Sequence, residues 1–179
     1  MAAPSDEQLM LALRDGELSA FDALFRRHYE TVRSMCARMV ASGDTGDDLA
    51  QETFLRILRH RGTFRGDARF TTWVYRIARN VCLEALARAS RDDRLVAAWG
   101  AEVSNETSPS GADDDLQQLE AAMRALSQEH REVLVLCRYQ GLPFTEVGEI
   151  LGCTAGAARV RAHRALAALR AHMQSCPPN

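Results

Sequence analysis

Arginine and histidine side chains are concentrated near the C-terminus, in a segment that carries no acid. Beyond residue 150 the chain has four arginines, two histidines and no aspartate or glutamate. Three of these arginines lie within residues 159–164. Guanidinium groups neutralise phosphates and can bind guanine through two hydrogen bonds, so this segment could bind nucleic acid. An arginine-coated, solvated surface helix in an ordinary bundle is the alternative.

The residues around this segment follow the pattern of a helix-turn-helix unit. Thr145 can cap a first short helix that ends near Leu151, Gly152 supplies a tight turn, and Thr154 can cap a second short helix. One face of the second helix carries small apolar residues that allow close packing: Ala158, Ala162, Ala165 and Leu169. In such units the second helix enters the major groove, which favours DNA binding.

Aromatic and arginine side chains are interleaved in a second block, residues 64–73. The block contains Phe64, Arg65, Arg69, Phe70 and Trp73. Aromatic faces stack on unpaired bases and arginines follow the backbone, which is the chemistry of single-strand binding. The helix that follows places Arg76, Arg79 and Asn80 opposite its apolar face. For Phe70 or Trp73 taken alone, a place in the core is the favoured interpretation.

A third block, residues 47–55, places acids and glutamine on one helix surface. Asp47, Asp48, Gln51 and Glu52 face away from Leu49 and Phe54. This polar surface could have a functional role, or the acids could simply complement the positive end of the helix dipole.

The elements that must position these blocks are all predicted to be helical. Apolar residues recur at spacings of three and four through residues 5–91 and again through 116–173, and no strand pattern occurs. The stretch 92–115 is polar and too long for a loop inside one compact domain. We therefore expect an all-α protein of two small helical domains, residues 5–91 and 116–174, joined by a flexible acidic linker.

The distribution of charge is more informative than its total. The chain has 179 residues, 22 basic side chains that are all arginine, and 24 acids, for a net charge of −2. Residues 5–91 hold 14 arginines and 12 acids, residues 92–115 one arginine and seven acids, and residues 116–179 seven arginines and five acids. The positive charges of two mildly basic domains are thus cancelled in the total by the acidic stretch 92–115.

Several function classes are disfavoured. The sequence has no Gly-rich phosphate loop, H-E-x-x-H or nucleophile motif, so an enzyme is not expected. The five cysteines are odd in number and lack C-x2-C spacing, which indicates reduced, mostly buried thiols and no metal site. No signal peptide or membrane span is predicted, so we expect a cytoplasmic protein without a cofactor.

Two groups of motifs, one on each side of the acidic stretch 92–115, together resemble the sigma-70 superfamily of RNA polymerase sigma factors. Residues 48–54 and 64–80 are similar to region 2, and the motifs in 126–165 are similar to region 4. The length leaves no room for the extra domains of primary factors, so the chain resembles the extracytoplasmic-function (ECF, group 4) type. The resemblance covers about 150 residues in the expected order.

The resemblance implies a role for each block. Core polymerase, through the clamp helices of β′, would be bound by Asp47, Asp48, Leu49, Gln51, Glu52, Phe54 and Leu55. The −10 element would be bound and opened by Phe64, Arg65, Arg69, Thr72, Trp73, Arg76 and Asn80. The −35 element would be bound by Thr154, Arg159, Val160, Arg161, His163 and Arg164.

The resemblance also implies partners. Residues 126–139 would meet the β flap, the acidic linker would thread a basic polymerase channel, and an anti-sigma factor could be wedged between the two domains. A helix-turn-helix regulator that acts without polymerase is the alternative, as is a helical adaptor with no role at DNA. Gly148 departs from the family's usual alanine, and Ala157 and Ala158 from its Thr-Val; we expect both departures to weaken capping and packing slightly.

Overall fold

The computed structural model describes residues 3–41, 45–98 and 114–175, and within these ranges the chain is helical and contains no strand. The elements in order are α1 (Asp6–Arg14), α2 (Ser19–Val40), α3 (Gly46–His60), the 3-10 turn η1 (Arg61–Thr63), α4 (Phe70–Ala98), α5 (Asp114–Ala125), α6 (Gln128–Leu134), the π-helical turn η2 (Val135–Tyr139), α7 (Phe144–Leu151) and α8 (Ala155–Ser175). None of the described helices could cross a bilayer.

The first domain is a bundle of α1–α4 around one apolar core. Residues at helical spacing on α2 and α4, among them Leu24, Val32 and Val74, are fully buried against Phe54 and Ile57 of α3. Phe25 and Phe54 lie edge to face, with ring centroids 4.8 Å apart. The predicted apolar stripes therefore form the core of this domain.

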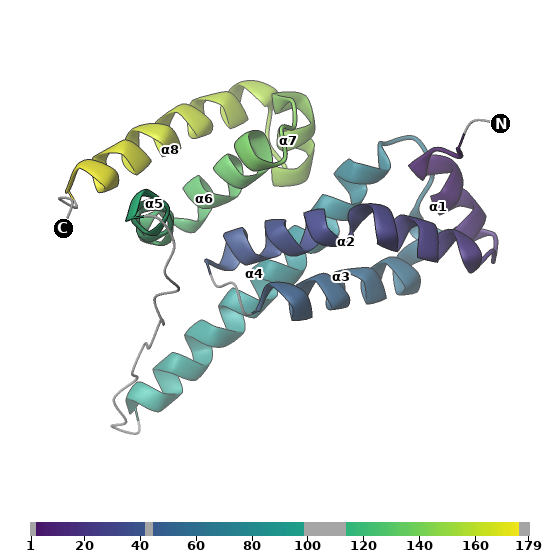
Figure 1. The fold of residues 1–179 in the computed structure, drawn as a ribbon, viewed down its shortest axis with the longest axis horizontal. Helices are drawn as coiled ribbons and strands as arrows, with labels where there is room; N and C mark the ends of the chain where they lie inside the picture. The colour runs from purple at the N-terminus through teal and green to yellow at the C-terminus, as the bar shows by residue number, and fades with distance from the viewer. Residues whose placement is uncertain (1–2, 42–44, 99–113, 176–179) are drawn as a thin grey trace.

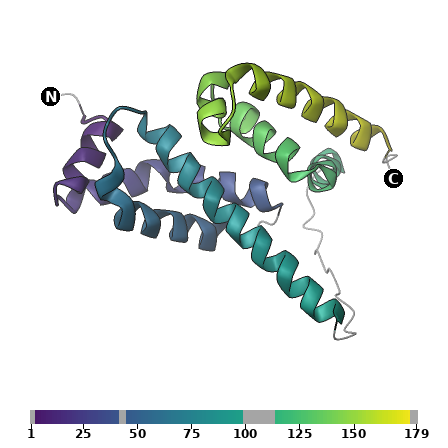
Figure 2. The ribbon, with the colours of Figure 1, turned by 180° about the vertical axis from the view of Figure 1, so that it is seen from behind.

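The second domain, α5–α8, lies beside α2 and α4 of the first (Figures 1 and 2). Its core includes Leu134, Val147 and Ile150, and the alanines predicted to permit close packing on α8 are buried. Arg131 is also buried, and its guanidinium donates to the carbonyl oxygens of Met123, Arg124, Leu126 and, in the first domain, Met39. These bonds satisfy carbonyls at the ends of α2 and α5 that have no partner within their own helices.

The turn between α7 and α8 confirms two predictions and corrects a third. Gly152 adopts a left-handed conformation with φ of 68°, and the Thr154 hydroxyl accepts a hydrogen bond from the amide of Ala157 at 3.1 Å, which caps α8. The expectation that Gly148 weakens packing is wrong. A Cβ at position 148 would lie 2.6 Å from the carbonyl oxygen of Cys153, so the turn needs glycine there.

Three helix boundaries differ from those predicted. Thr145 does not cap α7, because the helix begins at Phe144 with Pro143 at the N-cap position. α8 is not short: it runs for 21 residues, since residues 157–175 contain no glycine or proline and are rich in strong helix formers. α4 continues from Phe70 to Ala98, past the predicted domain end at residue 91. The rest of the predicted linker up to residue 113 lies outside the described residues, as do residues 42–44 and Cys176, one of the five cysteines.

Candidate nucleic-acid interface

The first half of α8 presents most of the predicted −35 residues to solvent. Thr154, Arg159, Val160, His163 and Arg164 are exposed, and Arg161 is half-buried. Val160 is one of the few large apolar side chains that remain exposed, with 51% of its surface accessible. An apolar side chain between basic ones suits a major groove, where thymine methyl groups and guanine acceptors lie side by side.

A shallow groove runs between the start of α6 and this face of α8. Glu129 and His130 line one wall, and Val160, Arg161 and Arg164 line the other. Arg161 Nε lies 4.0 Å from Glu129 Oε2, so this guanidinium points toward α6. Arg159 is stacked over the ring of Phe144, with 5.5 Å between the guanidinium carbon and the ring centroid. The structure therefore brings this predicted set together on one surface.

The aromatic residues of the second block form a buried cluster. Phe64, Phe70 and Trp73 are between 0% and 8% exposed, and the ring centroids of Phe64 and Trp73 lie 5.4 Å apart at a steep angle. The interpretation of Phe70 and Trp73 as core aromatics is therefore confirmed. In this state their rings fix the loop 64–69 to the start of α4 and do not present a face to solvent.

The polar residues of the same block divide between two sides of α4. Arg65 and Arg69 on the loop and Arg76 and Asn80 on the helix are exposed. Thr72, by contrast, is 6% exposed, because it faces the second domain. The structure thus places four of the seven predicted −10 residues at the surface, two of them one helical turn apart on α4.

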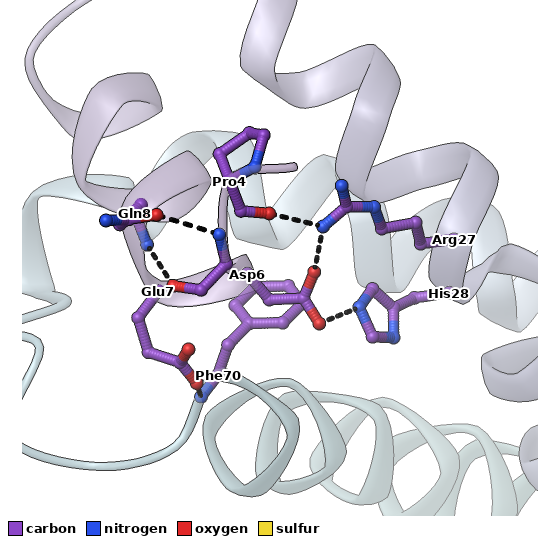
Figure 3. Close-up of polar contacts among 8 residues, drawn as sticks. Pro4, Asp6, Glu7, Gln8, Arg27, His28 and Phe70 are labelled. Atoms are coloured by element: carbon purple, nitrogen blue, oxygen red, sulfur yellow. Dashed lines mark hydrogen bonds and ion pairs between the residues drawn. The ribbon is translucent and has the colours of Figure 1, made fainter. Parts of the chain in front are cut away.

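The N-terminal helix holds the loop and the start of α4 in place. Glu7 Oε1 accepts a hydrogen bond from the backbone amide of Phe70 at 3.0 Å (Figure 3). Arg14 donates to the carbonyl oxygen of Phe64 at 3.5 Å. Leu11 lies against Gly66, whose φ of 79° turns the loop. α1 therefore supports the second block at three points.

α1 is itself anchored to α2 through Asp6. Arg27 donates to Asp6 Oδ1 at 2.8 Å, and His28 Nε2 lies 2.8 Å from Oδ2 (Figure 3). Burial favours a higher pKa for Asp6, but the bonds from Arg27 and His28 outweigh it and lower the pKa. The amide of Phe70 is the main cause of the lowered pKa of Glu7. Both carboxylates are thus held in their charged form.

Sequence reasoning missed Glu7 as the cap of α4. The cap comes from a residue 63 positions away, so no local motif encodes it. A signal was nonetheless present. The side chain of Arg69, directly before Phe70, has no oxygen that could cap the first amides of α4, so the first amide needed a more distant partner.

The third block lies on α3 and divides between surface and core. Asp47, Asp48, Gln51 and Leu55 are exposed, with Leu55 47% accessible. Leu49 and Phe54 are buried and pack the bundle. Glu52 is half-buried and accepts a bond from Arg56 Nε at 2.8 Å. Arg56 also makes two bonds to Glu84, which ties α3 to α4. The surface available to a partner is therefore the acidic start of α3 together with Leu55.

Comparison with known families finds one match on each domain. The family model for Sigma-70 region 2 matches residues 24–92, and that for Sigma-70, region 4 matches residues 122–171. The two matches fall on the first and second domains and leave α1, with Glu7, outside the region 2 match.

Comparison with individual proteins extends the likeness over nearly the whole chain. The RNA polymerase sigma factor CarQ of Myxococcus xanthus is 39% identical over 166 residues, covering 90% of this chain and 93% of CarQ. The ECF RNA polymerase sigma-E factor of Escherichia coli is 31% identical, covering 92% of each chain. The solved structure of CnrH in complex with the cytosolic domain of CnrY is similar over 97% of this chain and all of that one, with a TM-score of 0.74 and 26% identity.

Proposed function

The chain belongs to the ECF-type RNA polymerase sigma factors of the sigma-70 family, and from this membership we propose how its surfaces share the work of starting transcription. A factor of this type binds core RNA polymerase, directs it to promoters through −10 and −35 contacts, and assists promoter melting. The observation that carries this function is the presence of both regions, in order, in one chain. A helix-turn-helix regulator acting without polymerase would not need the first.

We assign −35 recognition to the exposed face of α8. Arg164 and Val160 are offset by one helical turn and line the same groove, so they are the side chains proposed to reach base edges. Arg161, which points toward Glu129 at the edge of this face, is proposed to contact a phosphate. Thr154 is proposed to act through the cap of α8. Arg159 and His163 complete the surface.

We assign −10 recognition to the loop 64–69 and the adjoining face of α4. The exposed Arg65, Arg69, Arg76 and Asn80 are proposed to follow the unpaired strand and bind its bases. Phe64 and Trp73 are proposed to support the loop from the core. Thr72, whose hydroxyl donates to Glu146 Oε2 at 3.0 Å, is proposed to contact DNA only once that bond is broken. α1 belongs to this site as its support.

We assign core polymerase binding to the start of α3, through Asp47, Asp48, Gln51 and Leu55, with Glu52 at the edge and Leu49 and Phe54 as packing residues. Residues 126–139 are proposed to meet the β flap, and the acidic segment after α4 to follow a basic channel of the polymerase. The first domain is proposed to span residues 5–91, with α4 extending beyond it to Ala98, and the second residues 116–174, with α5 beginning just before it at Asp114.

We further propose that an anti-sigma factor binds this chain, as CnrY binds CnrH in the similar structure. An inhibitor wedged between the domains would have to replace the contacts that now join them. The family consists of initiation factors, and we propose that this member acts in the cytoplasm, without enzymatic activity, cofactor or metal. An affinity purification from the source cells that yields no inhibitor, together with constitutive activity, would contradict the anti-sigma proposal.

Run-off transcription tests the function directly. Core RNA polymerase with this protein should produce discrete transcripts from a pool of genomic promoters, and core polymerase alone should not. Arg164→Ala should lower promoter affinity by about 1–3 kcal/mol, the usual value of a bidentate base contact. The control is Arg170→Ala, an exposed arginine farther along α8. Absence of any promoter-specific transcript would overturn the function.

A matched pair of leucines tests the polymerase surface. Leu55→Ala should weaken binding to core polymerase by about tenfold, because docking would bury the 47% of this side chain that is now exposed, and burial of apolar surface contributes about 0.8 kcal/mol for each CH2 group. Leu18→Ala removes a still more exposed leucine, before α2, and should leave binding unchanged. Titration of labelled polymerase measures both. Equal affinities for the two variants would exclude α3 as the docking surface.

A further inference from the structure

The last part of α4 projects beyond the bundle, past α2 and α3 and away from the second domain (Figures 1 and 2). Among the described side chains of α4, Cys82 is the last that is buried. Residues 87–92 are all exposed. Helices in proteins owe most of their stability to packing, and this segment gains little of it, so its surface is available to a partner.

The projecting segment continues the face of α4 that carries Arg76 and Asn80. At about 100° per residue, Arg91 lies within about 60° of both side chains around the helix axis, and Ala87 lies between them. Arg91 Nε donates to the carbonyl oxygen of Ala87 at 3.1 Å, so the guanidinium group is drawn back along the helix. Arg76, Asn80, Ala87 and Arg91 therefore form one exposed line along α4.

An acid, Glu84, borders this line between Asn80 and Ala87. Arg56 of α3 donates to both of its carboxylate oxygens, at 2.7 and 2.6 Å. A bidentate pair of this kind offsets the negative charge of the carboxylate. The line is therefore suited to an anionic partner along its whole length, although an acid lies beside it.

The rise of the helix determines what Arg91 can meet. At about 1.5 Å per residue, Arg91 lies about 16 Å beyond Asn80, which is the length of about five base pairs at roughly 3.4 Å each. The loop 64–69, at the other end of α4, is proposed to bind the unpaired strand. DNA that reaches Arg91 is therefore the part of the promoter that is still paired, on the −35 side of the −10 element.

We propose that Arg91 binds a backbone phosphate of the duplex between the −10 and −35 elements, about five base pairs from the bases bound near Asn80. This proposal rests on the proposed function, which places −10 recognition on the loop 64–69 and α4. Phosphate contacts fix the position of a duplex without reading its sequence. The contact at Arg91 therefore adds affinity and fixes the direction in which the duplex leaves α4, and it does not change the preferred promoter sequence.

Binding of the holoenzyme to two DNA probes tests this contact. Both probes carry an unpaired −10 strand mapped by run-off transcription. In the short probe the duplex ends at the upstream edge of the −10 element, and in the long probe it extends upstream by about one turn of the double helix. Arg91→Ala should weaken binding to the long probe by about threefold, on the scale of one exposed ion pair, and leave binding to the short probe unchanged.

Salt dependence and a control variant identify the contact as one to a phosphate. Arg91→Ala should lower the slope of log affinity against log salt by about one on the long probe. Arg91→Lys should keep most of the affinity, because a phosphate also accepts a point charge. Arg26→Ala, which removes an exposed arginine of α2, is the control and should bind both probes as the wild type does.

A matched pair of alanines tests the face of the helix. Ala87→Glu places an acid on the exposed line and should weaken binding to the long probe by a similar factor. Ala89→Glu places the same acid about 200° around the same exposed segment and should have no effect. Both alanines are exposed, so neither substitution disturbs the core.

The outcomes separate this inference from the proposed function. If the wild-type holoenzyme fails to bind the short probe, the −10 function assigned to α4 is wrong. If it binds both probes and Arg91→Ala behaves as Arg26→Ala does, the phosphate contact is wrong and the function stands. Equal losses on the two probes for Arg91→Ala, or equal losses for Ala87→Glu and Ala89→Glu, would also overturn the contact.

Discussion

The two DNA-facing surfaces of this protein are built in opposite ways. The surface of α8 is specified locally: Thr154 caps the helix, Gly152 and Gly148 form the turn, and the exposed side chains follow within ten residues. The surface of α4 depends on distant residues. Its first amide is capped by Glu7, and one side of it is covered by Glu146, 74 positions along the chain from Thr72.

This difference suits what each surface is proposed to bind. Duplex DNA has a regular groove, and a rigid helix with a short turn is sufficient to read it. An unpaired strand has no fixed shape, so a loop that binds it has to be held in one conformation by the protein.

Gly148→Ala should have the largest effect, and only on the α8 side. The new Cβ would lie 2.6 Å from a carbonyl oxygen and 3.2 Å from two further backbone atoms, none of which can move independently. We expect a loss of about 1–3 kcal/mol in the free energy of unfolding, as for other overpacked sites, and weaker −35 binding. Denaturant unfolding and binding to a −35 duplex measure the two effects.

Gly156→Ala is the control for stability. The nearest atom to a Cβ there is the Thr154 hydroxyl oxygen at 3.9 Å, so the alanine should be tolerated and should stabilise α8 by up to about 1 kcal/mol. If the two alanines proved equally harmless, the turn would not need glycine at position 148. The claim that the α8 surface is specified by this local turn would then be wrong.

Glu7→Ala should have a smaller effect, on the α4 side only. Removal of the cap should cost about 1 kcal/mol of stability and loosen the start of α4, so −10 binding by the holoenzyme should fall while −35 duplex binding is kept. Asp22→Ala, which removes an exposed acid on α2, is the control. A parallel loss at both DNA elements would mean that α1 supports the whole fold rather than one surface.

Features that depend on neighbours in sequence could be predicted, and features that depend on distant residues could not. The helices, the turn at Gly152 and the cap at Thr154 depend on neighbours in sequence, and the sequence predicts them. The burial of Phe70 and Trp73 followed from their size and helical spacing. Glu7 at Phe70 and Glu146 at Thr72 could not be predicted, because a hydrogen bond between residues 63 or 74 positions apart depends on how whole helices pack. The role of Gly148 was misjudged for a similar reason: the need for glycine comes from a backbone atom across the turn.

The smallest predicted effect is a pH dependence at the start of α4 that is absent at the start of α8. Folding lowers the pKa of Glu7, and a group of this kind stabilises the fold above its unfolded pKa and loses that contribution as the pH falls through the folded value. The ordinary value for Glu7 is 4.5, so the loss begins below that pH. Hydrogen exchange of first-turn amides, corrected for intrinsic rates, should show protection of α4 declining there.

The cap of α8 is a neutral hydroxyl, so protection of its first turn should not follow the same curve. Glu7→Gln keeps an oxygen that can accept the bond from Phe70, but this side chain cannot titrate. The protection of the first turn of α4 should therefore depend less on pH than in the wild type, by less than about 1 kcal/mol in the free energy of opening. Identical pH curves for Glu7→Gln and wild type would show that the charge of this carboxylate does not support α4. The contrast between the two helix starts would then rest on distance along the chain alone and not on the chemistry of their caps.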